Sequence, residues 1–202
     1  MVRFTPELAD NPDRLRWNAR YSARPAPDFK PHPLAIEALA QALPSGPVLE
    51  LAAGPSGSAI LAAQAGRPVT VADASDVALD LLESEADRRG LRKLLTLVQA
   101  DLEVWQPGPA SYALVLCTAY WVAETGLFDA AAQAVLPGGI LAWEALTATA
   151  RRERPSLPAA WCLKAGEPAS LLPVGWRVIA QYEPPKAAGT RRRLIAARPG
   201  TY

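Results

Sequence analysis

The sequence contains few of the residues that build metal sites. Its 202 residues include one histidine, His32, and two cysteines, Cys117 and Cys162. The cysteines form no Cys-x-x-Cys pair and lie far from the histidine, so we expect no metal site. Two cysteines suffice for one disulfide, but nothing in the sequence argues for an oxidising compartment.

The sequence also lacks a charge excess and a long hydrophobic run. Its 21 basic and 20 acidic residues leave a net charge of +1, which gives no support to a nucleic-acid or anionic-membrane partner. No window approaches the roughly 18 apolar residues of a membrane span, and the N-terminus lacks the apolar core of a secretory signal. We therefore expect a cytoplasmic protein, either a monomer or a homodimer.

From Pro47 onward, short apolar runs alternate with helical patterns. The two final strands, 177–182 and 192–197, have no helix between them and should pair antiparallel. Alternating strands and helices predict an α/β fold: a Rossmann-like three-layer sandwich whose mostly parallel sheet ends in a C-terminal β-hairpin. The other strands are predicted at 48–51, 69–72, 94–99, 112–117 and 140–144, and the helices at 58–64, 76–89 and 127–134.

Residues 1–46 form a helical lead-in to a core at 47–202, within a single domain 1–202. Asn11 and Pro12 can cap a short helix, repeated prolines make 24–33 extended, and a second helix is predicted at 34–43. The first helix carries Trp17, Arg20 and Tyr21, which would be costly to leave exposed together. We expect residues 1–31 to be a lid over the open edge of the sheet.

A glycine-containing turn, VLELAAGPSG, joins the first strand of the core to its first helix. Gly54 and Gly57 allow the backbone to approach a ligand closely. Asp73, at the tip of the second strand, can accept hydrogen bonds from two ribose hydroxyls. Together with Glu50 these residues describe a nucleoside pocket. The alternative is that Asp73 or Ser75 only caps the following helix.

The turn differs from that of nicotinamide-dependent oxidoreductases, which usually have Gly-x-Gly-x-x-Gly against a pyrophosphate. Here Ala52 stands at the first glycine position, and Pro55 and Ser56 fill the turn. The carboxylate of Glu50 would repel a pyrophosphate. It suits a ligand that has no phosphate and carries a positive charge.

Motifs along nearly the whole chain resemble those of the class I S-adenosylmethionine-dependent methyltransferases. VLELAAGPSG looks like their first motif, VTVADAS like the second and VQADLEVW like the third, while YALVLCTAYW and LPGGILAWEAL resemble the fourth and fifth strands. The segment RWNARY resembles the lead-in of small methyltransferases near the tellurite-resistance and thiopurine groups. Ala52 and Ser56 replace two usual glycines. The resemblance implies seven strands, with 192–197 antiparallel between its neighbours.

The resemblance also implies S-adenosylmethionine as the cofactor and assigns residues to it. Asp73 would bind the ribose, Asp101 the adenine amino group, and Leu102 would pack on the adenine ring. Arg20 would face the cofactor carboxylate, with an exposed surface arginine as the alternative. The full set of expected cofactor-binding residues is Glu50, Ala52, Gly54, Gly57, Asp73, Ala74, Asp101, Leu102, Cys117, Arg20 and Tyr21.

Residues after the fourth and fifth strands are candidates for the acceptor pocket. The rings of Tyr120 and Trp121 can wall the methyl group or face the sulfonium, or they pack in the core. Glu144 can contact the acceptor or be a surface or helix-capping acid. The remaining candidates are expected to be structural: His32 in a loop, and Trp161 and Trp176 in the core beside the last strands.

The implied reaction is in-line transfer of the methyl group from the sulfonium to a small molecule. The protein contributes mainly position and orientation. A base is needed only if the acceptor must lose a proton, so no catalytic residue is assigned. Two alternatives stay open: a cofactor-binding protein without transferase activity, which the altered turn favours, and an NAD-dependent oxidoreductase, which the poor glycine motif disfavours.

Overall fold

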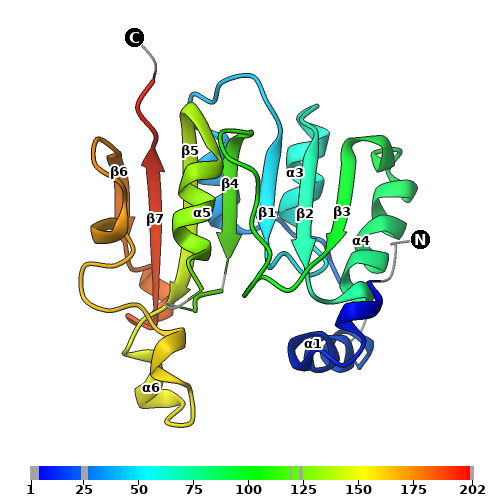
Figure 1. Cartoon of the computed structure of the whole chain (residues 1–202), viewed down its shortest axis with the longest axis horizontal. Coiled ribbons are helices and arrows are strands. Elements are labelled where there is room, and N and C mark those ends of the chain that lie inside the picture. Colours follow the sequence, from blue (N-terminus) through cyan, green and yellow to red (C-terminus); the bar gives the residue numbers. More distant parts are fainter. Residues whose placement is uncertain (1–4, 24–26, 119, 123–124, 201–202) are drawn as a thin grey trace.

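The chain folds into a seven-stranded sheet (Figure 1). The computed structural model describes residues 5–23, 27–118, 120–122 and 125–200. The strand order is β3-β2-β1-β4-β5-β7-β6, in which β7 is antiparallel to both neighbours and the other pairs are parallel. The predicted topology is confirmed. The bounds are β1 Val48–Leu51, β2 Val69–Asp73, β3 Leu95–Gln99, β4 Tyr112–Thr118, β5 Val135–Leu146, β6 Arg177–Tyr182 and β7 Arg191–Ala197.

Helices cover both faces of the sheet and thus make the predicted three layers. Helices α2, α3 and α4 bury their apolar side chains against one face, and α5 packs on the other. None of the helices in the described residues is long and apolar enough to cross a bilayer. The helix bounds are α1 Pro12–Ser22, α2 Pro33–Leu39, α3 Gly57–Gln64, α4 Asp76–Arg88, α5 Leu127–Ala134 and α6 Ala150–Glu153.

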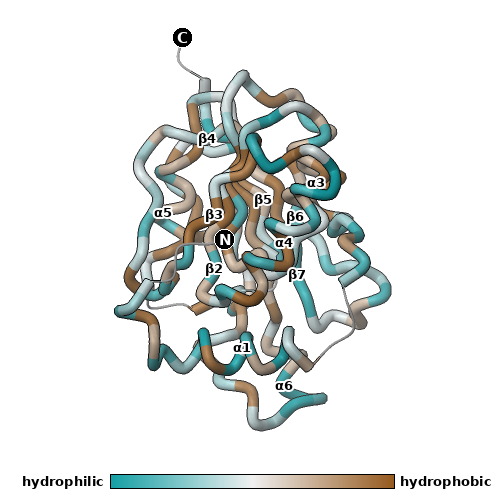
Figure 2. Tube along the Cα trace, turned by 90° about the vertical axis from the view of Figure 1, so that its right-hand side faces the viewer, coloured by the Kyte–Doolittle hydropathy of each residue, from teal (hydrophilic) through white to brown (hydrophobic). Residues whose placement is uncertain are grey.

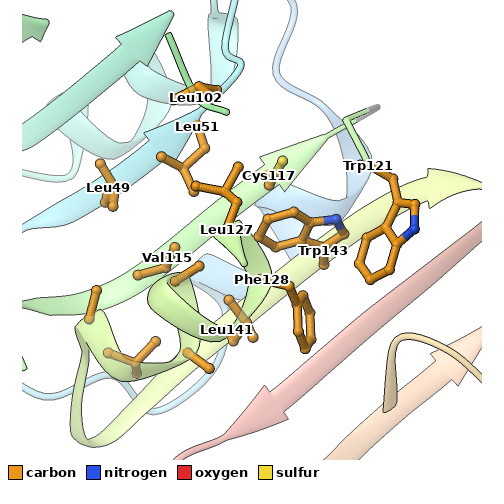
Figure 3. Close-up of a cluster of buried hydrophobic side chains, with 14 of the residues drawn as sticks. Leu49, Leu51, Leu102, Val115, Cys117, Trp121, Leu127, Phe128, Leu141 and Trp143 are labelled. Atoms are coloured by element: carbon orange, nitrogen blue, oxygen red, sulfur yellow. The ribbon is translucent and has the colours of Figure 1, made fainter. Parts of the chain in front are cut away.

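The apolar residues gather inside the sandwich (Figure 2). Under α5, the ring of Trp143 meets the rings of Phe128 and Trp121 edge to face, with centroid distances of 5.2 and 6.3 Å (Figure 3). Such pairs add to the burial of large apolar surfaces. Because both faces of the sheet are covered, its strands read as continuous apolar runs, and this is why the sequence locates them.

Two helical segments lie outside the sandwich, beyond the carboxyl ends of the parallel strands. Both views place α1 and α6 at this end of the molecule (Figures 1 and 2). The carboxyl ends of parallel strands are where α/β proteins bind ligands. The two segments therefore stand where covers of a site would stand.

Some predicted boundaries differ from the structure. Helix α2 ends at Leu39 rather than at residue 43, and the short helix α6 was not predicted. The Leu-Pro-Gly-Gly segment is part of β5, which begins at Val135 directly after α5. The pairing of β5 with β4 shifts register between Tyr112 and Leu114, and Gly138 has a φ of 75°. This irregular start of the strand explains the turn-like sequence.

Gly57 is in close contact with the chain's own backbone. A Cβ atom at this position would lie 2.1 Å from the carbonyl oxygen of Phe29 and 2.5 Å from the carbonyl carbon of Lys30. The extended segment that leads to α2 thus crosses the first turn of α3 where only glycine leaves room. This contact is a structural reason for Gly57, in addition to the ligand approach that the sequence suggested.

Candidate functional site

Glu50 is buried at the carboxyl end of β1. Its carboxylate is 2% exposed and accepts a hydrogen bond from the hydroxyl of Ser56 at 2.6 Å. The same hydroxyl oxygen accepts from the backbone N–H groups of Ser58 and Ala59, both at 3.0 Å, and so caps α3. Burial raises the pKa of Glu50 to about 7. Ser56, which replaces a glycine of the family pattern, thus orders the turn and holds this carboxylate.

Ala52 lies in the left-handed region of the backbone map, with a φ of 49°. A residue with a Cβ pays about 1–2 kcal/mol for this conformation. The turn nevertheless keeps the geometry that glycine favours, because the N–H of Ala52 is bound to the carbonyl of Ala72 at 2.9 Å on β2. Gly54 follows with a φ of 59°. The alanine substitution has therefore not changed the turn into an ordinary connection.

Asp73 closes the same turn from β2. One carboxylate oxygen accepts from the N–H of Gly54 and the other from the N–H of Ser75, both at 2.8 Å. Ser75 is the cap of α4, because its hydroxyl oxygen accepts from the N–H of Ala78 at 3.0 Å. Burial raises the pKa of Asp73. Asp73 is thus not the helix cap, and a carboxylate with about four acceptor positions retains capacity for a ligand.

The two carboxylates have no basic side chain to balance them. Neither Glu50 nor Asp73 forms an ion pair within the described parts of the chain, and each is buried. The charge of Asp73 adds to the rise in the pKa of Glu50. Two buried acids without a cation carry a large desolvation cost. This end of β1 and β2 is therefore electrostatically suited to a positively charged ligand.

Helix α1 is fastened over this edge of the sheet. The guanidinium of Arg14 binds both carboxylate oxygens of Asp76, at 2.8 and 3.1 Å. Asn18 donates to Asp76 at 2.7 Å and accepts from the hydroxyl of Ser75 at 2.6 Å. The amide of Asn11 donates to Asp101 at 2.9 Å. The helix thus reaches the ends of β2 and β3 through polar contacts.

Tyr21, also on α1, covers the glycine turn. Its hydroxyl lies 2.5 Å from the position that a Cβ atom would take on Gly54. The hydroxyl of Tyr21 therefore occupies the space that a side chain at Gly54 would need. This contact joins Tyr21 to the turn itself, and the predicted role of Tyr21 toward the cofactor stays a prediction.

A cavity of about 510 Å³, the first cavity, lies next to the turn. It is enclosed by α1, by the segments after β3 and β4, and by residues 146–161. Four of the predicted site residues line it together: Arg20, Asp101, Tyr120 and Trp121. Ala52, Gly54 and Asp73 stand beneath α1, outside the lining of this cavity.

Trp121 belongs both to the core and to the first cavity. Its side chain is 6% exposed and packs on Phe128 and Trp143 (Figure 3). Its indole N–H is buried without a hydrogen-bond partner among the described residues. A buried donor without a partner typically costs about 1–3 kcal/mol. Trp121 is therefore a core residue that also lines the first cavity, and its role toward a ligand stays a prediction.

Two predicted cofactor residues lie in the core. The thiol of Cys117 is fully buried at the end of β4, and burial raises its pKa. Leu102 is packed into the same cluster under α5 (Figure 3). Neither side chain lines the first cavity. The predicted side-chain contacts of Cys117 and Leu102 with a ligand find no support in this arrangement.

The predicted place of Glu144 beside Tyr120 and Trp121 is wrong. Its carboxylate is on the opposite face of the sheet, where it binds Arg193 at 2.6 Å and Arg191 at 2.9 Å. Burial alone would raise its pKa, but hydrogen bonds from His32 and Arg193 lower it to about 2. Glu144 lines a separate second cavity of about 560 Å³. Since successive strand residues alternate, Trp143 facing α5 sends Glu144 to the other side.

Three further residues were expected to be structural, and His32 lies in the loop before α2 as expected. His32 is the cap of α2, because its Nδ1 atom accepts from the N–H of Leu34 at 3.2 Å. Trp161 was expected in the core, but it lines the first cavity, where the guanidinium of Arg16 lies 5.1 Å from its ring centroid. Trp176 packs against the core as expected. For Trp161, the sequence contains no signal that distinguishes a residue lining a cavity from one packed in the core.

The raised pKa of Glu50 gives a pH-dependent stability. Below about pH 4.5, Glu50 is protonated in both the folded and the unfolded protein. Between about pH 4.5 and 7, only the unfolded chain loses this proton. The folded protein therefore loses stability as pH rises through this window, by up to about 3 kcal/mol. We expect Glu50→Gln to raise the melting temperature at pH 8 and to leave it nearly unchanged at pH 4.5. Calorimetric melting at both pH values checks this, and equal shifts at both would contradict it.

Comparison with known proteins agrees with this geometry. Residues 48–139, from the first strand to the start of β5, match the family model of a methyltransferase domain. No curated protein matches the sequence.

Among solved structures, a protein that converts a disulfide bond into a thioacetal group in echinomycin biosynthesis shares 18% identity at a TM-score of 0.70, covering 94% of this chain and 93% of its own. The CcbJ methyltransferase from Streptomyces caelestis shares 18% identity at 0.64, covering 94% and 97%. The glycopeptide N-methyltransferase MtfA in complex with S-adenosylmethionine shares 22% at 0.58, covering 82% and 87%.

At these identities the solved structures show the fold, and the family model adds the methyltransferase domain that carries the glycine turn and Asp73. Residues 48–139 of the chain thus match a methyltransferase domain, and the chain has the fold of the solved methyltransferases.

Proposed function

We propose that the protein transfers the methyl group of S-adenosylmethionine to a small molecule held in the first cavity. The observation that carries the proposal is the buried pair Glu50 and Asp73, which lacks a cationic partner in the described structure. A cofactor with an ammonium and a sulfonium group would offset the cost of burying these acids. A pyrophosphate would increase that cost, which disfavours the nicotinamide alternative.

Residues around the turn would hold the cofactor in defined ways. Asp73 has acceptor capacity left for ribose hydroxyls after its bonds to Gly54 and Ser75. Asp101 lines the first cavity and can accept from an amino group. Arg20 lines the same cavity and has no carboxylate partner among the described residues, so it is free to face the carboxylate of the cofactor.

S-adenosylmethionine supplies an already activated methyl group. The chain's own residues would hold the acceptor atom in line with it and exclude water, through α1 above and the rings of Tyr120 and Trp121 at the end of β4. Burial raises the pKa of the Tyr120 phenol. At neutral pH this group stays protonated, so it can donate a hydrogen bond to the acceptor but does not serve as a base.

The proposal is tested in two steps. Calorimetric titration with S-adenosylmethionine, S-adenosylhomocysteine and NAD should show binding of the first two and none of NAD. A methyl-release assay over a panel of small acceptors should then show turnover. Binding of NAD alone would favour an oxidoreductase, and cofactor binding without transfer to any acceptor would favour a binding protein. The finer resemblance to the tellurite-resistance and thiopurine groups stays a prediction.

A further inference from the structure

One wall of the first cavity is apolar and aromatic. It is formed by the segment after β4 and by the chain that follows β5 around α6. Asp101, which follows β3, lines the same cavity, and its charge adds to the rise in the pKa of Tyr120. A ring or another planar apolar group fits between the side chains of this wall. The residues of this wall are Tyr120, Trp121, Val122, Leu146, Leu157 and Trp161.

The same wall carries an unpaired arginine. Arg154 follows α6 and lines the first cavity, and no carboxylate forms an ion pair with it in the described parts of the chain. Of the other cations of the lining, Arg20 is assigned above to the carboxylate of the cofactor, and two are bound to acidic side chains. Arg16 is bound to Asp13 at 2.7 Å, and Arg191 is bound to Glu144 at 2.9 Å. Arg154 is therefore the cation on this wall that is available to an anionic ligand.

The indole N–H of Trp121 is buried behind the same wall. It is the buried side-chain polar atom that lacks a partner among the described residues, and its residue lines the cavity. Buried donors are normally satisfied. Because its nitrogen is buried, the ring of Trp121 contributes to the wall through its apolar surface and not through this donor.

We infer that the methyl acceptor is a planar, ring-containing carboxylate, held by Arg154 and by the rings of the apolar wall. This inference rests on the proposed function, since it names the substrate class of the same site. The planar fork of an arginine binds a carboxylate through two parallel hydrogen bonds. The acidic side chains of the lining, Asp13, Asp101 and Glu103, stand on α1 and after β3.

The second cavity suits such an acceptor less well. Its lining contains no phenylalanine, tyrosine or tryptophan, and Arg191 and Arg193 both already bind the buried carboxylate of Glu144. An anion there would compete with Glu144 for cations that lie within 2.9 Å of it. The ring-containing carboxylate is therefore assigned to the first cavity.

The test compares matched ligands that differ only in charge. The probes are 3- and 4-hydroxybenzoate and 6-hydroxy-2-naphthoate, each beside its neutral amide, measured by ligand-observed NMR in the presence of saturating S-adenosylhomocysteine. We expect at least one carboxylate to bind at least about tenfold more tightly than its amide, as loss of a charge-assisted hydrogen bond predicts. Amides that bind as tightly as the acids, or no binding by either class, would overturn the inference.

Variants then assign the preference to Arg154. Arg154→Gln should reduce the preference for the carboxylate to less than about threefold, while Arg152→Gln, an exposed neighbour on α6 outside the cavity, should retain it. Retention of the full preference by Arg154→Gln also contradicts the inference. Calorimetry with S-adenosylhomocysteine on the parent and both variants distinguishes failure of the proposed function from failure of the acceptor class. Absence of cofactor binding counts against the proposed function. Normal cofactor binding without a preference for the carboxylate counts against the acceptor class alone.

Discussion

Deletion of residues 1–22 is expected to leave a folded protein whose rate of methyl transfer is lower by a factor of at least about one hundred. Helix α1 contributes no strand to the sheet, and its contacts are polar links to Ser75, Asp76 and Asp101 at its rim. Without it the carboxyl edge opens to water and the cofactor and acceptor lose their cover. Initial rates, S-adenosylhomocysteine affinity and the melting temperature measure the effect.

The end point of this deletion follows from the structure. Removal of residues 1–31, the segment that the sequence alone marks as the lid, would also take away Phe29 and Lys30, which pack on Gly57. A loss of activity would then have two explanations. Ending the deletion at 22 retains this contact and removes α1 together with the short segment before it, in which Leu8 is buried and Thr5 binds Gln99.

Point variants give the deletion its controls. Asn18→Ala removes the hydrogen bonds to Ser75 and Asp76 and should lower activity in the same direction. Leu15→Ala, on the exposed side of α1, should have little effect. Added S-adenosylhomocysteine should slow hydrogen exchange in α1 of the intact protein. If exchange is unchanged and the truncated form binds and turns over normally, α1 is a packing element and not a lid.

Asp73→Ala is expected to lower the affinity for S-adenosylhomocysteine by at least about tenfold, because charged hydrogen bonds contribute roughly 1.5–3 kcal/mol each. The structure adds a second effect. The side chain, 7% exposed, also binds the N–H groups of Gly54 and Ser75, so its removal should lower stability as well. Calorimetric titration and thermal melting measure the two effects separately.

A matched destabilised variant separates these contributions. Ala78→Gly on α4 should cost about 1 kcal/mol of stability while leaving every carboxylate of the site in place. Its affinity for S-adenosylhomocysteine should stay close to that of the parent. An Asp73→Ala protein that binds as tightly as the parent would show that this carboxylate serves only the turn.

Sequence reasoning located the strands and the turn because both have local signals. Apolar runs mark buried strands, and Gly54 and Asp73 stand where a turn and a strand tip are readable from neighbouring residues. The closing hairpin was predictable for the same reason. The family resemblance, however, supplied the order of the strands, which no local pattern contains.

The rest of the site could not be predicted, because it depends on the face of the sheet toward which a side chain points and on contacts between residues far apart in the sequence. Glu144 was misplaced because both faces of β5 are buried, and a continuous apolar run does not show which way a strand points. The contacts of α1 join residues 62 and 90 positions apart, such as Arg14 with Asp76 and Asn11 with Asp101. Common polar residues at such separations leave no sequence signature. Trp161 and Arg154 were missed for the same reason.

The position of β7 has a consequence for how the protein is made. The strand β6 is synthesised first, yet it reaches the sheet only through β7, whose residues Arg191–Ala197 bind β5 on one side and β6 on the other. Until the residues of β7 leave the ribosome, β5 has an open edge and β6 has no partner in the sheet. Unpaired edges of this kind favour misassociation of nascent chains. The completed width of the sheet therefore has to wait for the synthesis of β7, and loss of residues 191–197 would remove this strand and detach β6 as well.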